Sequence, residues 1–193
     1  TLDGVAFIQP RRSQVDIVQA VGRAIRKATN KHVGTIVIPV FIDKSEDPED
    51  ALASSAFEPV WSVVKALRSH DEALGHELDQ LRYNLGRYRT PQPRPARIIF
   101  DLPQGITPEF ADAFDTHLVI ETTASWDFWH GLLQAYTDSQ GHASPPQDFE
   151  TADGYKLGTW VNNQRSTKKA GKLDKDRFDR LDALDGWTWD PQA

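Results

Sequence analysis

Apolar side chains in the first 43 residues are arranged as two strands separated by a helix. An apolar stretch over residues 2–9 predicts a strand. Residues 33–42 form a nearly unbroken, β-branched apolar run, which is typical of a strand buried on both faces of a parallel sheet. Between them, apolar residues at helical spacing predict an amphipathic helix, whose buried stripe is formed by Val15, Val18, Val21 and Ile25. This order predicts one βαβ unit with a right-handed crossover.

The middle of the chain is predicted to be connecting structure around a helical extension. Residues 43–58 are acidic and contain Pro48, which is typical of a linker. From Val60 apolar residues repeat every seven positions, which predicts one long helix or two helices broken near Gly75. We favour packing of this helix against the body of the protein over a coiled-coil dimer, because fewer than four heptads are present.

Residues 90–124 are predicted to be a connector with little helix. A proline at every second position over residues 90–95 predicts a stiff, extended segment. The arginines around it fit either contact with a nucleic-acid backbone or a solvated basic surface. Beyond it we expect a short strand over Ala96–Leu102, a short helix over Pro108–Phe114 and a second strand over Thr116–Thr122.

Three amphipathic helices are predicted after residue 125. Ser125 is expected to cap the first helix, Gly171 to end the second and Asp174 to cap the third. Five tryptophans in this segment are available as core residues. The pattern predicts a compact three-helix bundle.

Composition narrows the class of protein. The 193 residues contain no cysteine, which excludes disulfides and thiolate metal sites and suits a cytoplasmic protein. No apolar run reaches the roughly 18 residues that a membrane span needs, so no membrane partner is expected. The six histidines lack metal-ligand spacing, so we predict no metal site. Because methionine is absent and the chain opens inside a predicted strand, we expect a piece of a longer polypeptide.

Charge is distributed in blocks along the chain, although the formal net charge is −6. Residues 1–34 carry six basic and two acidic side chains, whereas residues 98–125 carry five acidic and no basic ones. Local patches rather than the total decide where phosphate binds. Arg23 and Arg26 lie three residues apart, on one helix face with Gln19, so two guanidinium groups can reach the same anion. Gly22 leaves room for a phosphate to approach. The alternative is an exposed helix with two solvated arginines, which would show the same spacing.

The stretch Gln19-Ala-Val-Gly22-Arg23-Ala-Ile-Arg26 resembles motif VI of superfamily 2 helicases and translocases. The flanking strands resemble those around this motif in the second RecA-like domain. The resemblance implies that Arg23 and Arg26 are catalytic and bind ATP with Gln19 and Gly22. It also implies that ATP and Mg²⁺ are held mainly by the first RecA-like domain. This chain has neither the phosphate loop nor the acidic box of that domain.

A second resemblance covers residues 125–190. The stretch Asp153-Gly-Tyr-Lys-Leu-Gly158-Thr-Trp160-Val-Asn-Asn-Gln164-Arg165, followed by Gly171-Lys-Leu173 and Gly186-Trp187, resembles the helicase-associated domain, a three-helix module thought to bind nucleic acid. Between Lys156 and Lys172 there are five basic and no acidic side chains. Such a helix can neutralise phosphates and reach base edges, although a solvated face would have the same composition. The candidate nucleic-acid-binding residues are Asn162, Asn163, Arg165, Lys168, Lys169 and Lys172.

Together these patterns predict an α/β fragment, the last βαβ of a RecA-like parallel sheet, followed by a helical extension and an all-α three-helix bundle. The expected segments are 1–43 (RecA-like), 44–95 (acidic linker and helical extension), 96–124 (short α/β connector) and 125–193 (helicase-associated). The implied function is the C-terminal portion of an ATP-dependent helicase or translocase, with DNA or RNA and the rest of the helicase chain as partners. The alternative is a non-enzymatic module that binds nucleic acid or protein and keeps a vestigial helicase motif.

Overall fold

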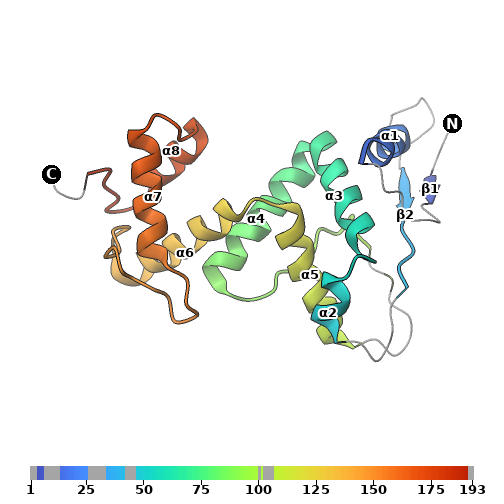
Figure 1. Cartoon of the computed structure of the whole chain (residues 1–193), viewed down its shortest axis with the longest axis horizontal. Helices are drawn as coiled ribbons and strands as arrows, with labels where there is room; N and C mark the ends of the chain where they lie inside the picture. The colour runs from blue at the N-terminus through green and yellow to red at the C-terminus, as the bar shows by residue number, and fades with distance from the viewer. Residues whose placement is uncertain are drawn as a thin grey trace. The chain divides into compact units, whose positions relative to one another are not determined.

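The chain divides into two compact units in a computed structural model (Figure 1), which describes residues 4–6, 14–25, 34–41, 47–99, 101 and 107–190. The first unit comprises Thr1–Leu81 and Pro91–Thr123, and the second comprises Arg82–Thr90 and Ala124–Ala193. One boundary therefore falls inside helix α4 (Glu72–Tyr88). The predicted division into four segments remains a prediction.

The N-terminal part of the first unit contains two short strands and a helix. Strand β1 (Gly4–Ala6) pairs in parallel with β2 (Thr35–Val37), and α1 (Gln14–Ile25) lies between them in the chain. Beyond β2, the described residues 38–41 are outside any strand, so the second strand is shorter there than the apolar run predicts. Val37 is 53% exposed and Phe41 93% exposed, which contradicts burial on both faces. That this segment ends a RecA-like sheet remains a prediction.

Helix α1 packs against α3 (Glu58–His70) through one apolar face. Ile17 and Val21 are buried there with Val63 and Ala66. The predicted stripe included Val21 but omitted Ile17, four residues earlier, which completes the face at helical spacing.

A helix occupies the segment predicted as an acidic linker. Helix α2 (Pro48–Ala53) begins after Asp47, whose side chain accepts a hydrogen bond from the Glu49 N–H at 2.9 Å. Proline at the first position and carboxylates in the first turn are helix-start signals, because the N-terminal N–H groups are unpaired and the dipole favours negative charge. The linker prediction is therefore wrong for residues 48–53.

The helix break predicted near Gly75 lies at Asp71 instead. Helix α3 ends at His70, and α4 begins at Glu72. The Asp71 side chain accepts a hydrogen bond from the Leu74 N–H at 3.0 Å, so the polar residue that interrupts the apolar heptads caps the next helix.

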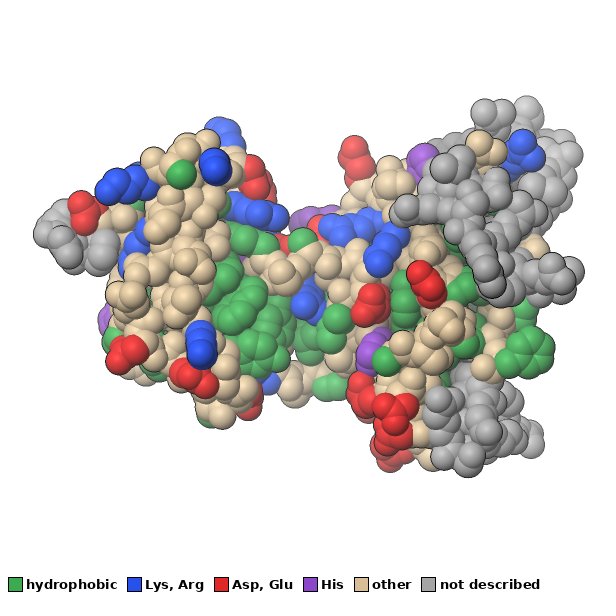
Figure 2. Space-filling model, in the orientation of Figure 1, with side chains coloured by type: hydrophobic (Ala, Val, Ile, Leu, Met, Phe, Trp, Pro, Cys, Tyr) green, Lys and Arg blue, Asp and Glu red, His purple; other side chains and the backbone are tan. Residues whose placement is uncertain are grey.

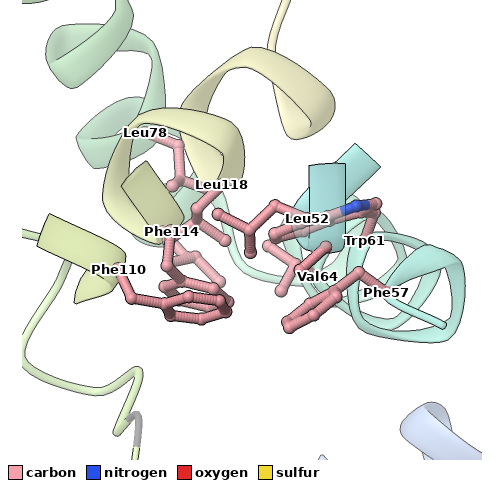
Figure 3. Close-up of a cluster of buried hydrophobic side chains, with 10 residues drawn as sticks. Leu52, Phe57, Trp61, Val64, Leu78, Phe110, Phe114 and Leu118 are labelled. Atoms are coloured by element: carbon pink, nitrogen blue, oxygen red, sulfur yellow. The ribbon is translucent and has the colours of Figure 1, made fainter. Parts of the chain in front are cut away.

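One helix replaces the helix and strand predicted over Pro108–Thr122. Helix α5 (Pro108–Thr122) buries Phe110, Phe114 and Leu118, which follow at i, i+4 and i+8. Figure 3 shows these side chains facing those of Leu52, Phe57, Trp61 and Val64 across the core. Packing overrides the β propensity of the Leu-Val-Ile run. The strand predicted from Ala96 is also wrong for the described residues 96–99, where the Ile98 N–H donates to the Pro95 carbonyl in a turn.

The second unit is all-α, as predicted. It contains α6 (Ser125–Gln140), α7 (Leu157–Lys169) and α8 (Lys175–Asp182) around buried Leu133, Leu157 and Leu181. Asp174 caps α8 through the Arg177 N–H at 2.9 Å, and Gly171 follows α7 with a φ of +69°, as expected. The cap predicted for α6 is wrong, because Ser125 is the first helical residue and Ala124 is the N-cap.

Two glycines bring Arg82–Thr90 into the second unit. A Cβ atom on Gly86 would lie 2.0 Å from the Phe128 carbonyl oxygen, and one on Gly131 would lie 2.1 Å from the Tyr83 carbonyl oxygen. The backbones of α4 and α6 therefore approach as closely as only glycine permits. The three-helix domain thus includes a fourth helical segment that its sequence pattern did not predict.

Candidate functional site

The stretch of residues 19–26, which we call the arginine motif, places its described polar side chains on the solvent-exposed face of α1. Gln19 and Arg23 are exposed and four residues apart, so they are neighbours on one face, away from buried Ile17 and Val21. Gly22 is half-buried, and a Cβ atom built there would have no atom of the described residues within 4 Å. The structure therefore brings Gln19 and Arg23 together beside open space, whereas Arg26 lies outside the described residues.

Helix α7 has an outer face without charge. Thr159, Asn163 and Ser166 are exposed and follow at i, i+4 and i+7, so they form one stripe, which we call the polar stripe. Asn162 is half-buried beside it. No acidic side chain occurs between Lys156 and Leu173. Hydroxyl and amide groups can donate hydrogen bonds to phosphate, and this face of α7 presents no carboxylate of its own to repel it.

The predicted lysines gather at the C-terminal end of α7. Lys168, Lys169 and Lys172 are all exposed. The Lys168 ammonium lies 5.1 Å from the ring centre of Trp189 and 5.8 Å from that of Phe178, so cation–π contact holds part of its charge. Lys169 and Lys172 therefore provide more accessible positive charge than Lys168 at the C-terminal end of α7.

Arg165, which was predicted to bind nucleic acid, is half-buried and packs against the segment after α8. Its Nε donates to the Thr188 carbonyl at 2.9 Å, and its guanidinium lies 5.0 Å from the ring centre of Trp187. Burial lowers the pKa of Arg165. The spacing of Leu157, Val161 and Arg165 already places this arginine on the buried face, a signal that the basic composition of the helix concealed. The contacts of Arg165 with Thr188 and Trp187 therefore hold the segment after α8 against α7.

A buried polar cluster joins α6 and α8. The Arg180 Nη1 pairs with Asp127 at 2.8 Å, and the ring of His130 stacks on Trp126 with 5.0 Å between ring centres. Burial, and secondarily the positive charge of Arg180, lowers the pKa of His130 to about 4. His130 is therefore neutral at pH 7 and belongs to the framework of the domain.

Five arginines between residues 68 and 97 each pair with an aspartate of the same unit. The pairs are Arg68–Asp79 at 2.6 Å, Arg97–Asp71 at 2.7 Å, Arg87–Asp138 at 2.8 Å, Arg89–Asp153 and Arg94–Asp115. Pairing offsets the charge of these arginines locally, and both interpretations of the arginines around residues 90–95 remain predictions.

Three half-buried aromatic side chains lie together in the second unit, and two of them, Trp129 and Trp160, are among the tryptophans predicted as core. Trp129 and Trp160 have nearly parallel rings 6.1 Å apart, with a 9° angle between their planes. Tyr155 meets Trp129 edge-on at 5.7 Å. All three are half-buried, and we call them the aromatic patch. The sequence predicted these tryptophans as core residues but did not predict their partial exposure.

Two further properties of the described residues limit the kinds of site present. Among them, no group of three or more histidine, aspartate or glutamate side chains could hold a metal ion. Within the same ranges, none of the helices combines the length and the hydropathy of a membrane span.

Comparison with known proteins identifies the terminal domain. Residues 123–190 match the family model of the helicase associated domain. This segment is therefore a helicase-associated domain, and the resemblance drawn from its residues is confirmed. A comparison with curated proteins found no match.

One solved structure, an "ATP-dependent Type ISP restriction-modification enzyme LlaBIII bound to DNA", matches with 23% identity and a TM-score of 0.49. The match covers 91% of this chain and 13% of that one, so the chain spans a small part of its length.

Proposed function

We propose that this chain is the C-terminal part of a nucleic-acid-dependent ATPase of helicase superfamily 2, and that its terminal domain binds DNA or RNA. The observation that carries the proposal is the helicase-associated domain over residues 123–190. Its helix α7 combines an uncharged polar stripe with lysines at one end and no acidic residue. A polyanion can approach this surface without meeting a carboxylate from the helix.

Within this proposal, Lys169 and Lys172 neutralise phosphates, with Lys168 contributing at the same end. Asn163 of the polar stripe, together with Asn162, contacts sugar, phosphate or base edges. Arg165 supports the surface from inside, because its guanidinium is committed to Thr188 and Trp187.

The N-terminal segment supplies the catalytic arginines in this proposal. Arg23 acts on the γ-phosphate of ATP as an arginine finger, Arg26 makes a second contact, and Gln19 relays between nucleotide and nucleic acid. The exposed Arg23 and Gln19, with open space at Gly22, support it. Exposed Val37 and Phe41 support contact with further structure in a longer polypeptide, since large apolar side chains left exposed mark a surface that meets other structure. ATP and Mg²⁺ would be held mainly by that longer polypeptide.

ATP hydrolysis by the complete polypeptide tests the proposal. Turnover should rise when single- or double-stranded DNA or RNA is added. Arg23→Ala should lower kcat by about 10³–10⁵, because a finger stabilises transition-state charge, while nucleotide binding stays nearly unchanged. Lys65→Ala, at an exposed position of α3, is the matched control and should keep the wild-type rate. The proposal would be refuted by a wild-type rate of hydrolysis in Arg23→Ala, or by a wild-type rate that does not change when nucleic acid is added.

A further inference from the structure

The aromatic patch is rigidly supported from beneath. Trp126 is 6% exposed and packs against Trp160 with 5.9 Å between ring centres. Its Nε1 donates to the Gln164 side chain of α7 at 3.0 Å. Trp160 and Trp129 are therefore held in place by buried neighbours, so a planar ligand would find their rings already oriented.

The patch continues the surface already assigned to nucleic acid. Trp160 lies on α7 three residues before Asn163 and four after Lys156, so it borders the polar stripe. Figure 2 shows hydrophobic side chains gathered at the surface of this unit beside α7. A strand whose backbone followed the polar stripe would bring its bases against these rings.

The charges around the patch suit a polyanion. Helix α7 and its flanks from Lys156 to Leu173 contribute no carboxylate. Asp153, two residues before Tyr155, pairs with Arg89, whose guanidinium lies 4.5 Å from the ring centre of Tyr155. A partly exposed aromatic group beside the hydrogen-bond donors and lysines of α7 is the combination that single-strand-binding proteins use, since every base has a π face.

We propose that the aromatic patch stacks unpaired bases, so that the helicase-associated domain prefers single-stranded nucleic acid. The inference rests on the proposed function and names its ligand class. Bases in a duplex are already stacked on each other, so duplex DNA uses the polar stripe and the lysines but not the patch.

Binding of the whole chain to three labelled probes separates stacking from phosphate contact. The probes are an oligothymidine of about 12 nucleotides, an oligomer of abasic sites with the same length and charge, and a duplex. Wild type should bind the oligothymidine about tenfold or more tightly than the abasic oligomer. Trp160→Leu should reduce this ratio to near one and leave duplex and abasic affinities unchanged, whereas Trp160→Phe should retain most of it.

The outcomes distinguish the inference from the function on which it rests. Equal wild-type affinity for thymidine and abasic probes would overturn base stacking, leave nucleic-acid binding standing, and point to a protein as the occupant of the patch. No binding to any probe would overturn both. Tryptophan emission of the wild type provides a measurement without any variant: the oligothymidine should quench it at saturation and the abasic oligomer should not. Equal quenching by both probes would again refute stacking.

Discussion

Gly158→Ala should destabilise the second unit, because the added methyl group would meet backbone atoms of the preceding loop. Gly158 lies in the first turn of α7, and its N–H donates to the Phe149 carbonyl at 3.1 Å. A Cβ atom there would lie 1.9 Å from the Pro146 carbonyl oxygen and 2.6 Å from that of Gln147. Close carbon–oxygen contacts in proteins are about 3.3 Å, so helix and loop would have to separate by roughly 1 Å or more.

The magnitude follows from two opposing contributions. Overpacking costs about 1–3 kcal/mol, and the upper end applies because both obstructing atoms are backbone. Alanine regains about 1 kcal/mol over glycine in a helix. Separation would also disturb Leu157 and Val161, which are fully buried in the core. The expected loss in the free energy of unfolding is therefore about 2 kcal/mol or more.

Urea unfolding followed by tryptophan emission measures this loss, since Trp126, Trp129, Trp160, Trp187 and Trp189 all lie in the second unit. The control is Gly22→Ala, the same change in a helix where no described residue lies within 4 Å of the added methyl group. It should leave the transition of the second unit unchanged. A Gly158→Ala midpoint equal to the wild-type midpoint would refute the close contact between α7 and residues 146–147.

Two further predictions concern buried polar groups of the second unit. Because the pKa of His130 is lowered to about 4 from 6.5, the unfolded chain binds more protons between these values, and stability falls as pH drops through this window. The loss between pH 7 and 5 should be about 2 kcal/mol greater in the wild type than in His130→Gln by urea unfolding, and parallel pH profiles would contradict this. Arg165→Ala should cost about 1–3 kcal/mol in the same assay through the lost Thr188 bond and Trp187 contact, yet leave the salt dependence of oligonucleotide binding unchanged. A flattened salt dependence would instead show that Arg165 contacts phosphate.

Local sequence signals predicted the second unit well. Asp174 and Gly171 act at helix ends through their own side chain and backbone, so their roles follow from chemistry within a few residues. The contribution of Arg82–Thr90 depends on contact between Gly86 and a helix about 40 residues later, which no local pattern reveals. The same applies to α5, where packing of Phe114 and Leu118 decides between helix and strand.

The candidate site was predictable in part. The arginine motif gave residue types and spacing, and the structure adds that Arg23 and Gln19 are exposed together. Composition alone placed Arg165 among the phosphate-binding residues, and it could not reveal that this side chain is half-buried with its guanidinium against Trp187. The partial exposure of Trp129 and Trp160 could not be predicted, because aromatic residues at helical spacing look alike in a core and in a surface patch.

The salt dependence of oligonucleotide binding by this chain tests the central claim, nucleic-acid binding through α7, most directly. Lys169→Glu with Lys172→Glu should weaken duplex binding and flatten the log–log slope by about two units, since each neutralised phosphate contributes about 0.9. Lys65→Glu with Lys175→Glu makes the same charge change at exposed positions of α3 and α8 and should leave the slope unchanged. A slope that is the same in wild type and the Lys169/Lys172 variant would contradict the claim.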